Sequence, residues 1–301
     1  MRRPDEMLTT LVDVQLDGAQ LAAFAAVIEL GSFDAAAARL HVTPSAISQR
    51  IKALEHRVGQ VLVTRGKPCA ATPAGIPVLR LAAQMALLEA EALAEIGGAG
   101  SGERPRVALA VNADSMSSWF TAVFGRLPDV LLDIRIEDQD HSAQLLREGA
   151  AMGAVTTERT PVPGCRVQPL GVMRYLPVAT PAYVQRHLPD GFTSEAAGVA
   201  PSLAWNRADA LQDTLVRKAF RRAISRPVHY VPTPEGYRAA VLAGLGWAMY
   251  PEQSIDPSFT RISRHHLDVP LYWQCWKLTS PTLTAVTEAV RSAAADRLRH
   301  H

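Results

Sequence analysis

The chain has 301 residues, of which 48% are hydrophobic and 20% charged, and its formal net charge is +2. This length predicts two or three domains, and the composition is typical of a globular protein rather than a fibrous or disordered one. No apolar run is long enough for a membrane span, and acids interrupt the first thirty residues where a secretory signal needs an apolar core, so we expect a cytoplasmic protein.

The N-terminal region predicts three helices in quick succession. Residues 16–30 carry apolar side chains at helical spacing, which are Leu21, Phe24, Ala25 and Ile28. Gly31 is a natural stop, and Ser32 can cap a second helix, FDAAAARLH, whose alanines allow another helix to approach closely. Thr43 can cap a third helix, with Pro44 at the first helical position, where its missing N–H costs nothing.

The third helix has two chemically different faces. Its apolar stripe consists of Ile47, Ile51, Leu54 and Val58. The opposite face consists of Ser45, Ser48, Gln49 and Lys52. Such hydroxyl, amide and ammonium groups can bond to base edges and phosphates in a major groove, while Arg50 flanks the apolar stripe and suits a phosphate contact or an internal ion pair. A solvated surface face is the alternative, but the preceding alanine-rich helix and the short turn HVT favour a helix-turn-helix.

A local excess of positive charge surrounds this helix. Between residues 39 and 67 there are six Lys and Arg residues and one acid, Glu55, which is a phosphate-binding pattern. The runs VLVT and CAAT flank Gly66-Lys67-Pro68 and predict a hairpin. A hairpin after a recognition helix is a wing, and Arg65 and Lys67 would hold it against the DNA backbone.

A long helix is predicted to follow, from Thr72-Pro73 to about Ile96, where the linker GGAGSG begins. Its apolar residues alternate spacings of three and four, as in a coiled coil, and they are Val78, Leu81, Met85, Leu88 and Ala92. We interpret this seam as a dimer contact. Packing within the same chain is the alternative.

After the linker, strands and helices alternate. The expected strands are RVALAV, LLDIRI, GAVTT, YLPVAT, SLAWN, VHYVP, WAMYP and LYWQCWK. The expected helices start near Ser115, Ser142, Pro181, Asp209, Glu235 and Pro281. This order predicts open α/β sheets, and about 195 residues are enough for two lobes with a cleft between them.

The block from Ser32 to Gly75, SFDAAAARLHVTPSAISQRIKALEHRVGQVLVTRGKPCAATPAG, resembles the winged helix-turn-helix of LysR-type transcriptional regulators. Shorter matches, in SAISQRIKALE, VNADS, IED with LLREGAAMGAV, and LYW, resemble the branch that governs export of lysine and arginine. The resemblance implies a homotetramer of paired dimers that binds an operator in double-stranded DNA, and a two-lobed effector domain shaped like a periplasmic binding protein.

The implied domain boundaries follow from the same resemblance. The winged helix-turn-helix would span 16–72, the linker and dimerisation helix 73–97, and the effector-binding domain 104–301. Within the last, lobe one would comprise 104–174 and 265–301, and lobe two 175–264. The effector would be a basic amino acid, lysine or arginine.

Several residues could hold such an effector. Its carboxylate suits helix N-termini and hydroxyls at strand ends, where VNADSMSSW offers Asn112, Asp114 and Ser115, and VPTPEGY offers Thr233 and Glu235. Its cations suit carboxylates, for which the sequence offers Glu137 and Asp138 in IEDQD, and Asp209. Trp119 is a candidate pocket wall.

Each of these candidates has a structural alternative. Asp114 could only cap its helix, Trp119 could belong to the core, and the IEDQD acids could form a solvated loop. Asp209 resembles one of two acids expected in this branch, and the second place holds Ala210, which leaves the choice between arginine and lysine open.

Other classes of protein fit less well. The chain has no GxSxG, HExxH, P-loop or complete dinucleotide-binding motif, so we expect no enzyme. Its three cysteines form no CxxC pair, and we expect neither metal nor cofactor. The alternatives are a LysR-type regulator of another metabolite, an amino-acid-binding enzyme and an architectural DNA-binding protein, although the last has no use for so long an α/β region.

Overall fold

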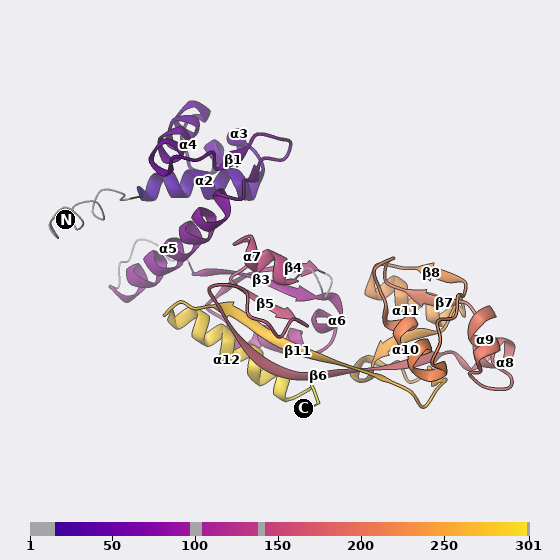
Figure 1. Cartoon of the computed structure of the whole chain (residues 1–301). Helices are drawn as coiled ribbons and strands as arrows, with labels where there is room; N and C mark the ends of the chain where they lie inside the picture. The colour runs from indigo at the N-terminus through magenta and orange to yellow at the C-terminus, as the bar shows by residue number, and fades with distance from the viewer. Residues whose placement is uncertain (1–15, 97–103, 138–141, 300–301) are drawn as a thin grey trace, which may run out of the picture.

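The structure is a computed structural model that describes residues 16–96, 104–137 and 142–299. A small helical domain lies at the N-terminal end, one long helix leads away from it, and an α/β region of two lobes makes up the rest (Figure 1). No helix in the described ranges has the length and apolarity needed to cross a membrane.

The N-terminal domain consists of α2 (Gly18–Leu30), α3 (Phe33–Arg39), α4 (Pro44–Val58), β1 (Val63–Thr64) and β2 (Ala70–Ala71). The predicted caps are present, because Ser32 accepts a hydrogen bond from the N–H of Ala35 and Thr43 accepts one from Ala46. β1 and β2 pair as an antiparallel hairpin. The core contains the predicted Leu21 and Phe24, whereas Ala25 and Ile28 are only partly buried.

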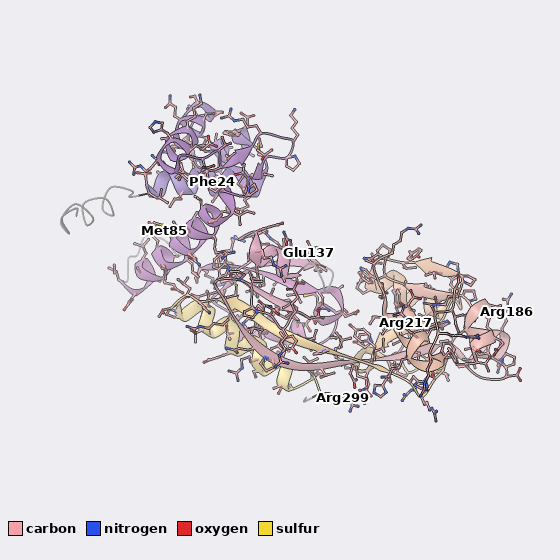
Figure 2. All side chains as sticks on the ribbon, in the orientation of Figure 1. Phe24, Met85, Glu137, Arg186, Arg217 and Arg299 are labelled. Carbon is pink, nitrogen blue, oxygen red and sulfur yellow. The ribbon has the colours of Figure 1, made fainter. Side chains whose placement is uncertain are left out.

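The long helix α5 (Gly75–Glu95) leads from this domain toward the α/β region. Thr72 helps to start it, accepting a hydrogen bond from the N–H of Gly75 at 3.1 Å. Within the predicted seam, Val78 is buried in the N-terminal core of its own chain, whereas Leu81, Met85 and Leu88 are 37–40% exposed (Figure 2 marks Met85).

The α/β region is built on one continuous seven-stranded sheet with the order β10-β6-β11-β5-β3-β4, in which β9 also pairs with β6. The strands of this sheet are β3 (Arg106–Asn112), β4 (Leu131–Glu137), β5 (Gly153–Thr156), β6 (Cys165–Ala179), β9 (Ala248–Pro251), β10 (Thr260–Arg261) and β11 (Leu267–Trp276). A separate parallel pair is formed by β7 (Ser202–Ala204) and β8 (Val228–Tyr230). β3 pairs in parallel with both β4 and β5.

The helices of this region are α6 (Ala113–Met116), α7 (Ser142–Arg147), α8 (Pro181–His187), α9 (Ser194–Val199), α10 (Leu211–Phe220), α11 (Pro234–Leu242) and α12 (Pro281–Ala295), with 3-10 turns η1 (Phe120–Arg126) and η2 (Glu252–Ser254). The helix expected from Ser115 is instead the single turn α6 followed by η1. α9 and β10 were not predicted.

The two lobes share their longest strand. We call lobe one the part built on β3, β4, β5, β11 and the first half of β6, with α6, α7 and α12. Lobe two contains α8–α11 and β7–β10. β6 runs from lobe one into lobe two (Figure 1), where its end pairs with β9 and β10. The sequence predicted only the last third of β6, from Tyr175 onward, because the first ten residues are amphipathic and lack an apolar run.

Candidate functional site

Helix α4 buries one face and exposes the other, as predicted. Ile47, Ile51 and Leu54 have no exposed surface. On the opposite face, Ser45, Gln49 and Lys52 are exposed and Ser48 is half-buried. Thr43 and Pro44 at the start of the helix are exposed, and Arg50, which flanks the apolar stripe, is half-buried. The hydroxyls of Thr43 and Ser45 lie 2.9 Å apart. The helix is therefore held in its domain by its buried apolar face, and it presents polar side chains to solvent.

The wing carries exposed cations beside this helix. The guanidinium of Arg65 stacks over the ring of Phe33 at 5.2 Å, and Lys67 is exposed. Arg39, by contrast, forms an ion pair with Glu29 at 2.8 Å. Because Glu29 offsets the charge of Arg39, the net positive charge of this surface is smaller than the count of Lys and Arg residues implied.

Glu55, the one acid in the basic stretch, has a structural role that the sequence did not reveal. Its Oε1 accepts hydrogen bonds from the N–H groups of Leu62 at 2.9 Å and Val63 at 3.3 Å. The carboxylate thereby connects the end of α4 to the start of the wing.

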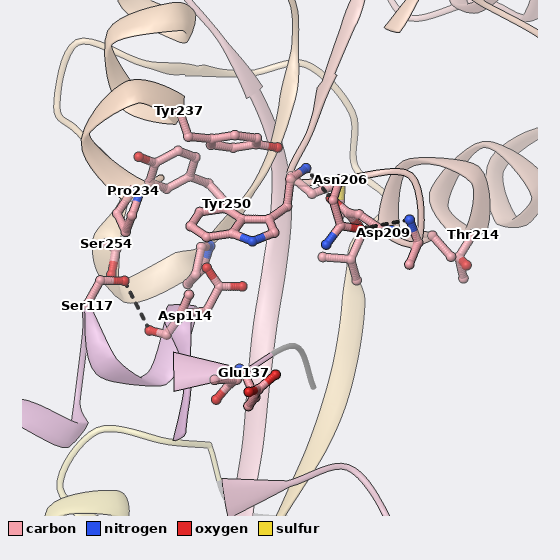
Figure 3. A pocket seen from close by; sticks show the side chains of 18 residues that line it. Asp114, Ser117, Glu137, Asn206, Asp209, Thr214, Pro234, Tyr237, Tyr250 and Ser254 are labelled. Carbon is pink, nitrogen blue, oxygen red and sulfur yellow. Dashed lines mark hydrogen bonds between the residues drawn. The ribbon is translucent and has the colours of Figure 1, made fainter. Parts of the chain in front are cut away.

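A second candidate site is a cleft between the two lobes, with a cavity of about 250 Å³. Three carboxylates line it, from Asp114 and Glu137 in lobe one and Asp209 in lobe two (Figure 3). Aromatic rings of Trp205, Tyr237 and Tyr250 form its lobe-two wall. Its described lining contains no Lys, Arg or His. The cleft is therefore negatively charged and partly aromatic.

The floor of the cleft lies at the carboxyl ends of two parallel strands. Asn112 ends β3 and is the register partner of Glu137, which ends β4. Asn112 is 2% exposed, and neither polar atom of its side-chain amide has a hydrogen-bond partner among the described residues. A buried amide normally has partners, so these atoms are available to a bound molecule.

Asp114 lies two residues after Asn112, in the single turn α6. The hydroxyl of Tyr175 donates a hydrogen bond to its Oδ2 at 2.6 Å. Burial raises the pKa of Asp114 to about 6, against the lowering effect of the Tyr175 hydrogen bond and with a smaller contribution from the negative charge of Asp209. A nearby cation would favour the ionised form of this carboxyl.

Asp209 organises the opposite wall. Its carboxylate accepts hydrogen bonds from the N–H groups of Trp205 at 2.9 Å and Leu211 at 3.1 Å. These bonds shape the loop that precedes α10 and cap the first turn of that helix, whose N-cap residue Ala210 has no capping side chain. Asp209 thus holds its own loop while its charge contributes to the cleft.

The tyrosines of the wall are neutral. Burial raises the pKa of Tyr237 well above its usual range, and the negative charges of Asp209 and Asp114 raise it further. Burial likewise raises the pKa of Tyr250. The rings of the two tyrosines lie 5.9 Å apart. Neutral aromatic faces beside carboxylates suit an organic cation.

Some predicted effector residues do not reach the cleft. Ser115 and Trp119 are buried in lobe one, with 0% and 1% exposure, because they turn inward from α6 and the segment after it. Thr233 is exposed and caps α11 by accepting from the N–H of Gly236, and Glu235 is exposed as well. Asp138 lies outside the described residues.

Three aromatic residues of the cleft were not predicted from the sequence. Trp205, Tyr237 and Tyr250 came from segments predicted as strands or helices, and their side chains converge only when lobe two folds. The one available signal was their position: Trp205 and Tyr250 lie at or near strand ends, and Tyr237 lies in the first turn of α11.

Comparison with known families decides the class of the protein. The model for bacterial regulatory helix-turn-helix proteins of the lysR family matches residues 19–76, and the model for the LysR substrate binding domain matches residues 100–299. The chain belongs to the LysR family. This LysR-family protein is a DNA-binding transcriptional regulator, and its relatives carry the names of regulators rather than enzymes.

Several relatives of this regulator are known. The HTH-type transcriptional regulator LysG of Mycobacterium tuberculosis is 70% identical over 294 residues, covering 96% of this chain and 97% of the relative. The lysine export transcriptional regulatory protein LysG of Corynebacterium glutamicum is 40% identical over 289 residues, covering 93% and 98%. A solved structure of full-length LysG from Corynebacterium glutamicum with bound effector Arg has a TM-score of 0.75 at 38% identity, covering 94% of this chain and 99% of that one.

Proposed function

We propose that this regulator senses a basic amino acid, arginine or lysine, in the cleft between its lobes and controls an amino-acid exporter gene in response. The observation that carries the proposal is the charge of the cleft, which has three carboxylates and no cationic side chain in its described lining. Arginine and lysine carry one net positive charge at neutral pH. The cleft therefore favours them over neutral and acidic amino acids.

The relatives support the same effector. The LysG structure from Corynebacterium glutamicum holds Arg as its effector, and the relative of that organism is named for lysine export. We assign Asn112, Asp114, Glu137 and Asp209 to the effector site, together with Trp205, Tyr237 and Tyr250. We do not assign Ser115, Trp119, Thr233 and Glu235, because none of them lines the cavity.

On the DNA side, we propose that α4 enters the major groove of an operator. Ser45, Ser48 and Gln49 would read base edges, and Arg50 and Lys52 would contact phosphates. Thr43 and Pro44 would place the helix start near the backbone, and Arg65 and Lys67 would place the wing there. We further propose that the protein is cytoplasmic, that two chains form a dimer through α5, and that dimers pair into a tetramer. Each dimer would present two α4 helices to a partly palindromic site.

The test of the effector is a calorimetric titration of the full-length protein with L-arginine, L-lysine and L-citrulline. Citrulline matches arginine in shape but replaces its guanidinium by a neutral urea group. Arginine or lysine should bind at least about tenfold more tightly than citrulline, a difference of about 1.4 kcal/mol. Equal binding of citrulline would refute the proposed role of charge. Binding of none of the three would refute the assignment of a basic amino acid as the effector.

A further inference from the structure

Helix α5 carries a second face, distinct from its exposed apolar seam. Arg80, Leu87 and Glu91 follow each other at steps of seven and four residues, so they lie on one side of the helix; the outer two differ by only about 20° around the axis. Leu87 is 3% exposed and packs in the core of lobe one. This side of α5 therefore faces the effector-binding part of its own chain, while Met85 and Leu88 face away from that core.

Arg80 binds the C-terminal end of a lobe-one helix. Its guanidinium donates hydrogen bonds to the carbonyl oxygens of Leu146 at 3.2 Å and Arg147 at 3.0 Å, at the end of α7, and to that of Pro163 at 2.9 Å. The last carbonyls of a helix lack partners within it and carry partial negative charge, so a cation there is stabilising.

A glycine after α7 makes room for the backbone of α5 at Arg80. Gly149 follows α7 in a left-handed conformation with φ +71, and a Cβ there would lie 3.1 Å from the backbone N of Arg80. Gly149 thus allows the backbone of α5 to approach lobe one closely. The contact is a packed junction between two backbones, with the guanidinium at its centre.

Glu91 binds the opposite kind of helix end, three turns further along α5. Its Oε1 accepts hydrogen bonds from the hydroxyl of Ser280 at 2.5 Å and from the N–H of Thr282 at 3.0 Å. Both donors belong to the start of α12, where N–H groups are unpaired and partial charge is positive. Arg80 and Glu91 therefore each meet a helix end of opposite partial charge.

The two anchored helices connect to the cleft by different routes. α7 begins at Ser142, soon after Glu137 of the cleft floor. α12 packs against β6 and β11, and β6 runs on into lobe two. A change in the relative position of the lobes would thus act on α7 and α12, and α5 is bound to both.

We propose that Arg80 and Glu91 are positioning residues that fix α5 to lobe one and so transmit effector binding to the DNA-binding domain. The proposal rests on the proposed function for its ligand, a basic amino acid. Neither residue touches the cleft or α4. Their removal should therefore uncouple the two sites while leaving each of them able to bind.

The test compares full-length wild type with Arg80→Ala, Glu91→Ala, Glu91→Gln and the control Glu89→Ala, which removes an exposed acid of the same helix. Three quantities are measured for each: L-arginine affinity by calorimetry, hydrogen exchange of the Thr282 amide, and the factor by which saturating L-arginine changes affinity for an operator selected in vitro with the wild type. A coupling factor of this kind is commonly about 5 to 150.

In Arg80→Ala and Glu91→Ala the coupling factor should fall toward one, with arginine affinity within about twofold of the wild type. Thr282 should exchange faster in Glu91→Ala. Glu91→Gln keeps an acceptor oxygen but loses the charge, so its coupling factor should lie between those of Glu91→Ala and the wild type. Glu89→Ala should behave like the wild type. A wild-type coupling factor in both alanine variants, or an equal loss in Glu89→Ala, would overturn the proposal.

The exchange measurement separates this proposal from the proposed function. If the wild type bound no arginine, the effector assignment would fail, but faster exchange at Thr282 in Glu91→Ala would still support the anchoring of α5. Unchanged exchange at Thr282 would overturn the anchoring whatever the effector proves to be.

Discussion

At the scale of the residue, Asp114 should make effector binding depend on pH. Burial raises its pKa to about 6, so it is mostly ionised at neutral pH and protonated below 6. A bound cation favours the ionised form, so the effector and the proton compete for this carboxyl. Arginine affinity should be constant above about pH 7 and fall as the pH drops through 6, by up to about tenfold per pH unit.

Calorimetry between about pH 5 and 8 checks this expectation, with Asp114→Asn as the comparison. The variant should bind arginine more weakly at neutral pH, because it has lost a charge, and its remaining affinity should vary little through pH 6. If the arginine affinity of the variant fell with decreasing pH as steeply as that of the wild type, the titrating group would be another residue of the cleft.

Gln49 and Arg65 should affect DNA binding in different ways, because we propose that Gln49 faces the groove, whereas Arg65 lies on the wing. Gln49→Ala should reduce discrimination between the selected operator and its single-base variants by about 1–3 kcal/mol if the amide makes a bidentate base contact. Arg65→Ala should weaken binding to all duplexes alike and reduce the salt slope by about one. Operator affinities measured at stated salt concentrations test both predictions. If Gln49→Ala discriminated between the operators as well as the wild type, Gln49 would have no base-reading role.

At the scale of the element, the connection between α4 and the wing depends on Glu55. Glu55→Ala leaves the N–H groups of Leu62 and Val63 without their acceptor, which costs about 1–3 kcal/mol for a buried donor. Faster hydrogen exchange at these two amides should report the loss. Glu29→Ala is the matched control, since its ion pair with Arg39 is exposed and contributes about 0–1 kcal/mol. Similar effects of the two substitutions would contradict the role given to Glu55.

At the scale of the whole molecule, the exposed seam of α5 is the surface through which we expect two chains to pair. Leu88→Glu places a charge where leucine burial would contribute about 1.5–3 kcal/mol, and it should shift the oligomer toward monomer in sedimentation velocity. Val199→Glu, on a residue 73% exposed in lobe two, is the control and should leave assembly unchanged. A Leu88→Glu protein that sediments like the wild type would move the contact elsewhere.

Features set by near neighbours in the chain could be predicted from the sequence. The caps at Ser32 and Thr43 and the buried stripe of α4 depend on residues three to seven positions apart, and a helix period is enough to recognise them. Asn112, Asp114 and Glu137 were predicted for the same kind of reason, because polar side chains directly after buried strands must lie at the edge of the sheet.

The tertiary structure alone decided which distant residues meet. The aromatic wall of Trp205, Tyr237 and Tyr250 faces Asp114 because β6 carries the chain from one lobe to the other, and no local pattern marks that path. The anchors of α5 are equally hidden, since Glu91 and its partner Ser280 are 189 residues apart. The hydrophobic periodicity of a helix or strand indicates which of its sides is buried. Which other element packs against that side depends on how all the elements of the fold are arranged.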